Sequence, residues 1–169
     1  MKESYVEALI LRKTAAEEGV LFIVNDRCDL ALAVDADGVH LGQDDLPIDY
    51  VRKMMGSEKL IGLSTHSADQ VKEADALKPD YIGFGPIFTP GSKRDHDPVV
   101  GMKGLRSIRS LTSLPIFAIG GIQVDQVGEL VQAGADGVAV ISAILRAQDV
   151  GHAVKSFLAR MPGQASSTS

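Results

Sequence analysis

The sequence predicts an α/β protein in which short parallel strands alternate with helices. Apolar runs rich in β-branched residues, each bounded by Gly, Asp, Pro or Ser, indicate strands at 21–24, 38–41, 60–63, 81–85, 115–119 and 137–141. Helical patterns precede, separate and follow them, at 6–18, 49–55, 68–77, 103–111, 124–133 and 150–160. Nearly continuous apolar strands that alternate with helices are typical of a parallel sheet covered by helices.

Local signals support several of these elements. Ser67, followed three residues later by Gln70, forms a capping-box pattern that predicts the start of the helix at 68–77. Gly134 stands where the helix at 124–133 should end. The interval after the fourth strand holds the long stretch "GPIFTPGSKRDHDPVVG", and long loops in compact α/β domains are usually functional or disordered.

The strand ends favour a barrel over a doubly wound sheet. Each strand finishes on polar or glycine-rich residues, and both folds bind ligands at the carboxyl ends of their strands. A TIM barrel also builds a phosphate site from the loops after its last two strands, where "AIGGI" (118–122) and "VISA" (140–143) supply glycines and backbone N–H groups. Because a closed (β/α)8 barrel has eight strands and this chain shows six, we expect a TIM barrel truncated at its N-terminus to about six βα units.

Length and composition narrow the class of protein. The 169 residues predict a single domain at 1–161, followed by a small, polar, disordered tail at 162–169. The net charge of -5 comes with no basic stripe, so a nucleic acid partner is not expected. The lone Cys28 is interpreted as a small buried hydrophobe. No apolar run approaches a membrane span and no signal-peptide pattern is present, so we expect a cytoplasmic protein without a membrane partner.

Two carboxylates follow neighbouring strands. Asp26 ends the first strand and Asp45 follows the second, and each alone would be read as a turn residue or helix N-cap. Carboxyl ends of adjacent parallel strands lie side by side, so the pair also fits a shared Mg²⁺ held with the help of substrate phosphates. The residues alone leave the structural and the metal-binding interpretations open.

The long loop and the last strands suggest phosphate binding. Lys93 would ordinarily be a solvated surface residue, but Thr89, Gly91 and Ser92 surround it with hydroxyls and flexible backbone, which is a workable phosphate cradle. The glycine pair in "AIGGI" is interpreted as a close backbone approach to a ligand rather than a simple tight turn. The four histidines show no metal-ligand spacing, and His66, at a strand end, is the one that remains of interest.

Six stretches spread over about residues 6–148 together carry a family resemblance: "FIVNDRCDLAL", "ADGVHLGQDD", "IGLSTHS", "YIGFGPIF…SK", "AIGGI" and "AGADGVAVISAI", in that order. The resemblance is to the thiamine-phosphate synthases, also called thiamine-phosphate pyrophosphorylases. It implies a Mg²⁺-dependent transferase that joins a 4-amino-2-methyl-5-hydroxymethylpyrimidine diphosphate to a thiazole phosphate and releases pyrophosphate.

The resemblance also assigns roles to positions. It implies Asp26 and Asp45 as metal ligands. Contacts to the pyrimidine diphosphate are implied for Asn25, Ser64 and Lys93, with Lys93 also acting in catalysis. The thiazole-phosphate contacts implied are Pro90, Gly91, Ser92, Gly121, Ile141 and Ser142.

Two departures from the family pattern bear on this hypothesis. The family usually carries a "QLR-x-K"-like segment after its second strand, and this chain begins beyond the corresponding point. The family also commonly has Pro-Thr where this sequence has Thr89-Pro90, so we expect the first hydroxyl of the loop at a shifted position. Uncovered apolar strand edges attract partners, which favours association, with a homo-oligomer as one form.

Two alternatives stay open. A thiazole tautomerase is a sister barrel that shares several of these motifs, but it tends to lack the second carboxylate, so Asp45 favours the synthase. A truncated, non-catalytic remnant that still binds thiazole phosphate would also account for the missing segment.

Overall fold

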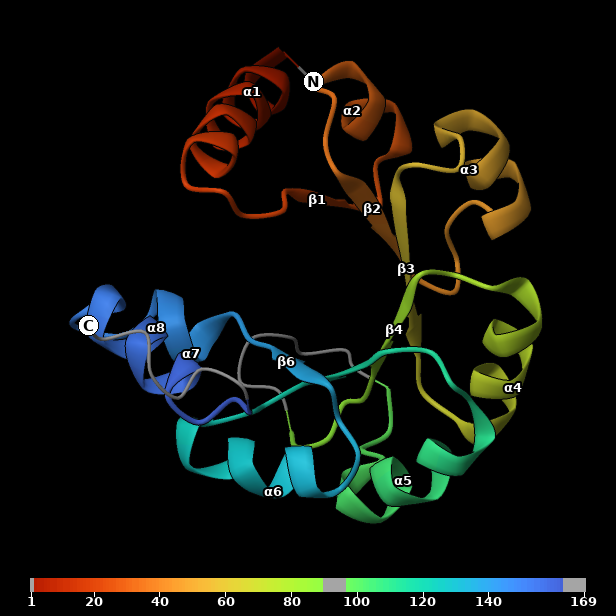
Figure 1. Cartoon of the computed structure of the whole chain (residues 1–169), viewed down its shortest axis with the longest axis vertical. Helices are drawn as coiled ribbons and strands as arrows, with labels where there is room; N and C mark the ends of the chain where they lie inside the picture. The colour runs from red at the N-terminus through yellow and green to blue at the C-terminus, as the bar shows by residue number, and fades with distance from the viewer. Residues whose placement is uncertain (1, 90–96, 163–169) are drawn as a thin grey trace. The chain divides into compact units, whose positions relative to one another are not determined.

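The structure is a computed structural model that describes residues 2–89 and 97–162 (Figure 1). Its strands are β1 (Ile23–Asn25), β2 (Gly38–Leu41), β3 (Leu60–Thr65), β4 (Tyr81–Phe84), β5 (Ile116–Ile119) and β6 (Gly137–Ala139). Its α-helices are α1 (Lys2–Glu17), α2 (Cys28–Ala33), α3 (Ile48–Met55), α4 (Ala68–Leu77), α5 (Gly101–Ile108), α6 (Val127–Gln132), α7 (Ser142–Leu145) and α8 (Val150–Leu158). Short 3-10 helices lie at Arg109–Leu111 and Val124–Gln126.

All assigned strand pairs are parallel, and the strands follow one another in the order β1-β2-β3-β4-β5-β6. This sequential order is that of a (β/α)8 barrel, whereas a doubly wound sheet reverses its strand order at a switch point. The predicted class, a barrel-type α/β fold with six βα units, is therefore confirmed.

The chain divides into two compact units. Unit 1 comprises residues 1–64 and 77–81, and unit 2 comprises residues 65–76 and 82–169. In unit 1, α2 contacts β1, β2 and the neighbouring helices α1 and α3. The fully buried core residues of unit 1 include Val39, Leu41, Val51 and Ile61. In unit 2, helices α4, α5 and α6 accompany β4, β5 and β6 (Figure 1), around a core that includes Ile82, Phe84, Leu105, Ile108, Ile116 and Leu130.

An arginine–aspartate contact recurs at the amino ends of the strands. An aspartate directly precedes β2, β4 and β6, and its carboxylate accepts the main-chain N–H of a residue at the start of the preceding strand, or just before it. These pairs are Asp37 with Phe22, Asp80 with Ile61, and Asp136 with Ile116. An arginine contacts each aspartate: Arg12 at 3.4 Å, Arg52 at 2.6 Å and Arg109 at 2.9 Å. Since the amino ends of barrel strands serve stability rather than catalysis, this repeat is a structural device.

Most element boundaries agree with the sequence prediction, and the differences are local. The first strand begins at Ile23 rather than residue 21, because Leu21 is 67% exposed and lies outside the sheet. Two short helices, α2 and α7, were not predicted, since six and four residues are too few to show an apolar period. Gly134 follows α6 with a φ of 105°, which confirms its predicted role at the end of that helix. Within the described residues, no helix is long and apolar enough to cross a membrane. The tail from residue 163 lies outside them.

Candidate functional site

The carboxyl ends of β1, β2 and β3 bring part of the predicted site together in unit 1. Asn25, the last residue of β1, is in register with His40 of β2, and His40 is in register with Gly62 of β3. Residues paired across neighbouring strands share a face of the sheet. Side chains along a strand alternate between the two faces, so Ser64 lies on the same face as Gly62, two residues before it. Asn25 and Ser64, both predicted to bind the pyrimidine diphosphate, thus lie on one face with His40 between their strands.

The two predicted metal ligands follow β1 and β2. Asp26 has a φ of 63°, the left-handed conformation that Asp tolerates better than most residues. The Asp45 side chain folds back so that its Oδ2 accepts the main-chain N–H of Gly42 at 2.7 Å. Its turn therefore holds one carboxylate oxygen in place. Both residues sit at the strand ends where barrel folds bind ligands.

The donor set fits Mg²⁺ shared with a ligand. Hard carboxylate oxygens are what Mg²⁺ prefers, and one or two carboxylates completed by phosphate oxygens is a common way to hold it. Among residues 2–89 and 97–162, no group of three or more His, Cys, Asp or Glu side chains is placed to hold a metal ion. Asp26 and Asp45 would therefore need oxygens from a bound diphosphate to complete the coordination.

His40 lies at the centre of a network that the sequence analysis did not predict. Its Nε2 is 2.9 Å from the Ser64 Oγ and its Nδ1 is 3.2 Å from the Tyr81 hydroxyl. Burial lowers the pKa of His40, against an opposing effect of Asp45, and burial raises the pKa of Tyr81 to about 12. No local signal in the sequence marks His40, because its partners Ser64 and Tyr81 lie 24 and 41 residues away along the chain.

Gln43 is a second residue that sequence reasoning missed. Its side-chain Nε2 donates to the main-chain oxygen of Ser64 at 2.6 Å, which ties the turn after β2 to the end of β3. Ser64 is therefore held through its carbonyl by Gln43 and contacted at its hydroxyl by His40. A residue predicted to touch ligand is thus fixed from two sides.

His66, the histidine of interest in the sequence, makes structural contacts in unit 2. Its Nδ1 lies 2.6 Å from the carbonyl oxygen of Gly85, and its Nε2 lies 3.4 Å from the carboxylate of Asp97. The capping pattern beside it is present in modified form: Ser67 Oγ accepts the N–H of Gln70, while the Gln70 side chain accepts the N–H of His66. His66 therefore anchors the segment that follows β4.

In unit 2 the glycine pair that was predicted to approach a ligand, Gly120 and Gly121, follows β5 and lies close to the loop after β4. Gly120 and Gly121 have φ values of 90° and 68°, and the Gly120 carbonyl accepts the N–H of Phe88 at 3.1 Å. A Cβ on Gly121 would lie 2.7 Å from the carbonyl oxygen of Thr89. The loop after β4 thus runs against the glycine pair with no room for a side chain.

The remaining predicted phosphate contacts lie beyond β6 and in the long loop. Ile141 and Ser142 stand at the start of α7, and Ile141 is 66% exposed. The first N–H groups of a helix have no intrahelical partner, so this turn offers donors of the kind that phosphate binds. Pro90, Gly91, Ser92 and Lys93 lie outside the described residues.

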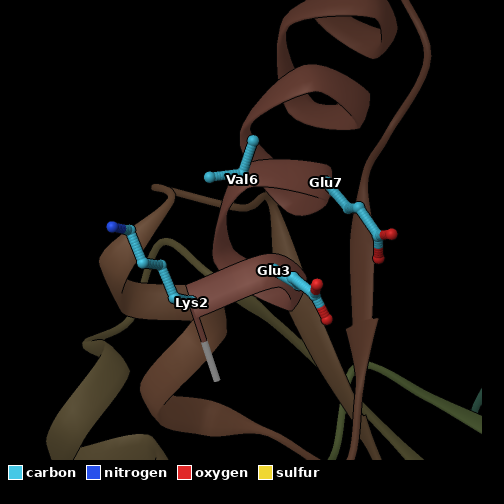
Figure 2. A pocket seen from close by; sticks show the side chains of 4 residues that line it. All are labelled: Lys2, Glu3, Val6 and Glu7. Carbon is cyan, nitrogen blue, oxygen red and sulfur yellow. The ribbon is translucent and has the colours of Figure 1, made fainter.

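Two open depressions on the described surface lie elsewhere. One is lined by Lys2, Glu3, Val6 and Glu7 of α1; Figure 2 shows Glu3 and Glu7 on one side of that helix and Lys2 and Val6 on the other. Another is lined by Lys2, Tyr5, Arg27, Asp29, Leu30 and Ala33, from α1 and the region of α2. Neither includes a predicted site residue. Both are open surface depressions rather than enclosed clefts, so we assign no chemistry to them.

Comparison with known proteins gives a consistent result. A family model described as thiamine monophosphate synthase matches residues 1–144. Thiamine-phosphate synthase from Moorella thermoacetica is 47% identical over 145 residues, which cover 86% of this chain and 69% of that protein. The same enzyme from Shouchella clausii is 48% identical over 151 residues, covering 89% and 72%. The solved structure of thiamine phosphate pyrophosphorylase from Pyrococcus furiosus superimposes with a TM-score of 0.84 at 40% identity, covering 92% of this chain and 74% of that one.

Proposed function

We propose a function from the premise that this chain belongs to the thiamine monophosphate synthase family. In this proposal the chain joins a pyrimidine diphosphate to a thiazole phosphate. The products would be thiamine phosphate and pyrophosphate. The observation that carries the proposal is the grouping of Asn25, Asp26, Asp45 and Ser64 at the ends of three neighbouring parallel strands. Two carboxylates beside an amide and a hydroxyl suit a diphosphate bound together with a cation.

In this proposal Asp26 and Asp45 hold Mg²⁺ and Asn25 and Ser64 contact the pyrimidine diphosphate. When bound, Mg²⁺ supplies neutralisation of the charge on the leaving pyrophosphate. Lys93, which lies outside the described residues, would add a positive charge to the same phosphates. These roles agree with the hard-oxygen donor set and with the fixed position of Asp45 over Gly42.

Thiazole phosphate is assigned to unit 2. Gly121 lies against the loop after β4, where a Cβ would come within 2.7 Å of the Thr89 carbonyl oxygen, and Ile141 and Ser142 offer helix-start N–H groups. Pro90, Gly91 and Ser92 complete this assignment from the loop.

The chain's own contribution is positioning and electrostatics. A pyrimidinylmethyl diphosphate ionises to a stabilised cation once its leaving group is neutralised, and the thiazole nitrogen then captures that cation. No side chain needs to remove a proton for the new carbon–nitrogen bond to form. Holding two substrates in a reactive arrangement removes a large part of the barrier by itself.

The test is a direct assay of the full chain with both substrates and Mg²⁺. Formation of thiamine phosphate with one pyrophosphate released per product supports the proposal. Turnover of a thiazole substrate alone, without metal or pyrimidine diphosphate, would indicate the tautomerase instead. Binding of thiazole phosphate without any product would indicate the non-catalytic alternative.

We place the protein in the cytoplasm as a single domain over 1–161, with small molecules rather than nucleic acid or membrane as partners. The net charge of -5 and the composition support this. Exposed apolar side chains on α1, including Ile10 at 61% and Leu11 at 55%, support self-association into a homo-oligomer.

A further inference from the structure

We propose that His40 is a positioning residue whose ring makes the Ser64 hydroxyl a hydrogen-bond donor toward the pyrimidine diphosphate, with the Tyr81 hydroxyl selecting the tautomer of that ring. This inference rests on the proposed function, because it names how one of its substrate contacts is oriented. It concerns a chain of three side chains within unit 1.

The geometry joins these side chains in series. The Tyr81 hydroxyl is 3.2 Å from Nδ1 of His40, and Nε2 on the opposite side of the ring is 2.9 Å from the Ser64 Oγ. The two rings are 5.5 Å apart between centroids and inclined by 30°. Each ring nitrogen of His40 thus has one hydroxyl partner.

The direction of the hydrogen bonds follows from the chemistry of these groups. In a neutral imidazole one nitrogen donates and the other accepts. A phenol is a more acidic, and therefore stronger, donor than a serine hydroxyl, so Tyr81 donates to Nδ1 of His40. The proton of the ring then sits on Nε2 and is donated to the Ser64 Oγ. Because the Ser64 oxygen already accepts that bond, its own hydrogen points to another acceptor.

Neighbouring residues hold the Tyr81, His40 and Ser64 side chains in place. A Cβ on Gly62 would lie 2.2 Å from the Tyr81 ring and 2.5 Å from Nδ1 of His40, so both rings pack directly over that glycine. The carbonyl of Ser64 is already taken by the Gln43 amide at 2.6 Å. A phosphate oxygen is an acceptor without hydrogens of its own, and a Ser64 hydroxyl fixed as donor matches it without reorganisation.

The first test reads the tautomer directly. Long-range proton–nitrogen NMR on the full ¹⁵N-labelled chain distinguishes the two neutral imidazole forms, and the His40→Gln variant assigns the signals. We expect His40 to carry its proton on Nε2 in the unsubstituted chain and to move toward the Nδ1 form in Tyr81→Phe. A proton on Nδ1 in the unsubstituted chain overturns the inference, whatever the binding experiments show.

The second test measures calorimetric affinity for the pyrimidine diphosphate in the presence of Mg²⁺. Tyr81→Phe should weaken binding about three- to tenfold, the effect of one hydrogen bond. In a Ser64→Ala background the same substitution should have no further effect, because Tyr81 acts through Ser64. Equal losses in both backgrounds would overturn the inference. Tyr50→Phe is the matched control: Tyr50 is a 62% exposed tyrosine of α3, and its loss of a hydroxyl should change neither readout.

These outcomes separate the two proposals. A chain that fails to bind the pyrimidine diphosphate in unsubstituted form and in Tyr50→Phe contradicts the proposed function. The tautomer of His40 and its response to Tyr81→Phe still decide the direction of the hydrogen bonds in that case. A chain that binds normally but shows no response to Tyr81→Phe keeps the proposed function and loses this inference.

Discussion

The main-chain N–H of Asp26 donates to the carbonyl oxygen of His40 at 2.8 Å, which extends the β1–β2 ladder one residue past the end of β1. At that residue the backbone turns into the left-handed region. The bond therefore holds a strained residue in place at the end of the strand. Strain of this kind collects at functional sites, where the surrounding structure maintains it.

The metal assignment predicts a loss of coupled binding in the double variant Asp26→Asn with Asp45→Asn. Asn adopts the left-handed conformation as readily as Asp, so the backbone should persist while the carboxylate charge is lost. Calorimetry on the unsubstituted chain should show Mg²⁺ and pyrophosphate binding together, each tightening the other, and this coupling should vanish in the variant. Asp44→Asn, an exposed neighbour, is the control. Tight Mg²⁺ binding without pyrophosphate would contradict the assignment.

Gly121→Ala should damage unit 2 and its proposed thiazole-phosphate site. The added Cβ would meet the carbonyl oxygen of Thr89 at 2.7 Å, at a φ of 68° that alanine adopts poorly. We expect a loss of about 1–3 kcal/mol in the free energy of unfolding and weaker thiazole-phosphate binding. The measurements are urea unfolding and ligand-detected NMR.

A second glycine provides the control for that experiment. Gly128 lies in α6, and a Cβ there would have nothing within 4 Å. Gly128→Ala should stabilise the chain by about 0.5–1 kcal/mol, because alanine loses less backbone entropy in a helix. If both substitutions destabilise equally, the close approach at Gly121 is not the cause.

The sequence predicted the order of elements because burial imposes it locally. Each strand is a short apolar run that must be covered, and those runs are visible without knowledge of their partners. Strand limits are different: β3 continues through Ser64 to Thr65, whose side chain is buried and donates its hydroxyl to the carbonyl of Gly83 at 3.1 Å. No local pattern reveals such a partner, so the predicted strand ended too early.

The contrast between local patterns and distant contacts also explains which site residues were predicted and which were missed. Asp26 and Asp45 were found because carboxylates after apolar strands stand out in a sequence. His40 was missed because its importance depends on register, which places it beside Asn25 and over Gly62. A histidine inside a strand carries no local sign of its neighbours. Contacts separated by tens of residues, such as that with Tyr81, become visible only in three dimensions.

His40 should make stability depend on pH. Burial lowers its pKa from the ordinary 6.5, so the unfolded chain takes up a proton at a higher pH than the folded chain does. The free energy of unfolding should therefore be highest above the unfolded-state pKa and fall as the pH drops from there toward the folded-state pKa.

Urea unfolding at pH 8 and pH 5 tests this by comparison with His40→Gln. The unsubstituted chain should lose more stability on acidification than the variant, since the other histidines are common to both. Asp45 partly opposes the shift, so Asp45→Asn should increase the loss. An identical pH response in the unsubstituted chain and His40→Gln would show that burial of His40 carries no proton linkage.

The recurring arginine–aspartate contact predicts that a substitution at the amino ends of the strands, away from the proposed site, lowers the free energy of unfolding. Asp80 Oδ2 accepts the N–H of Ile61 at 2.7 Å and contacts the Arg52 guanidinium at 2.6 Å. Asp80→Ala would leave that part-buried N–H without its acceptor and the guanidinium without its carboxylate. The expected loss in the free energy of unfolding is about 1–3 kcal/mol, the cost of leaving a buried hydrogen-bond donor without an acceptor.

The matched control is Glu18→Ala, which removes an exposed carboxylate just beyond α1 in the same unit. Its effect should stay within about 0.5 kcal/mol, as for surface substitutions in general. Because Asp80 stands at the amino end of β4, Asp80→Ala should leave the affinity for Mg²⁺ with pyrophosphate unchanged under conditions where the chain is folded. Loss of that affinity without loss of stability would mean that the contact serves the site rather than the fold.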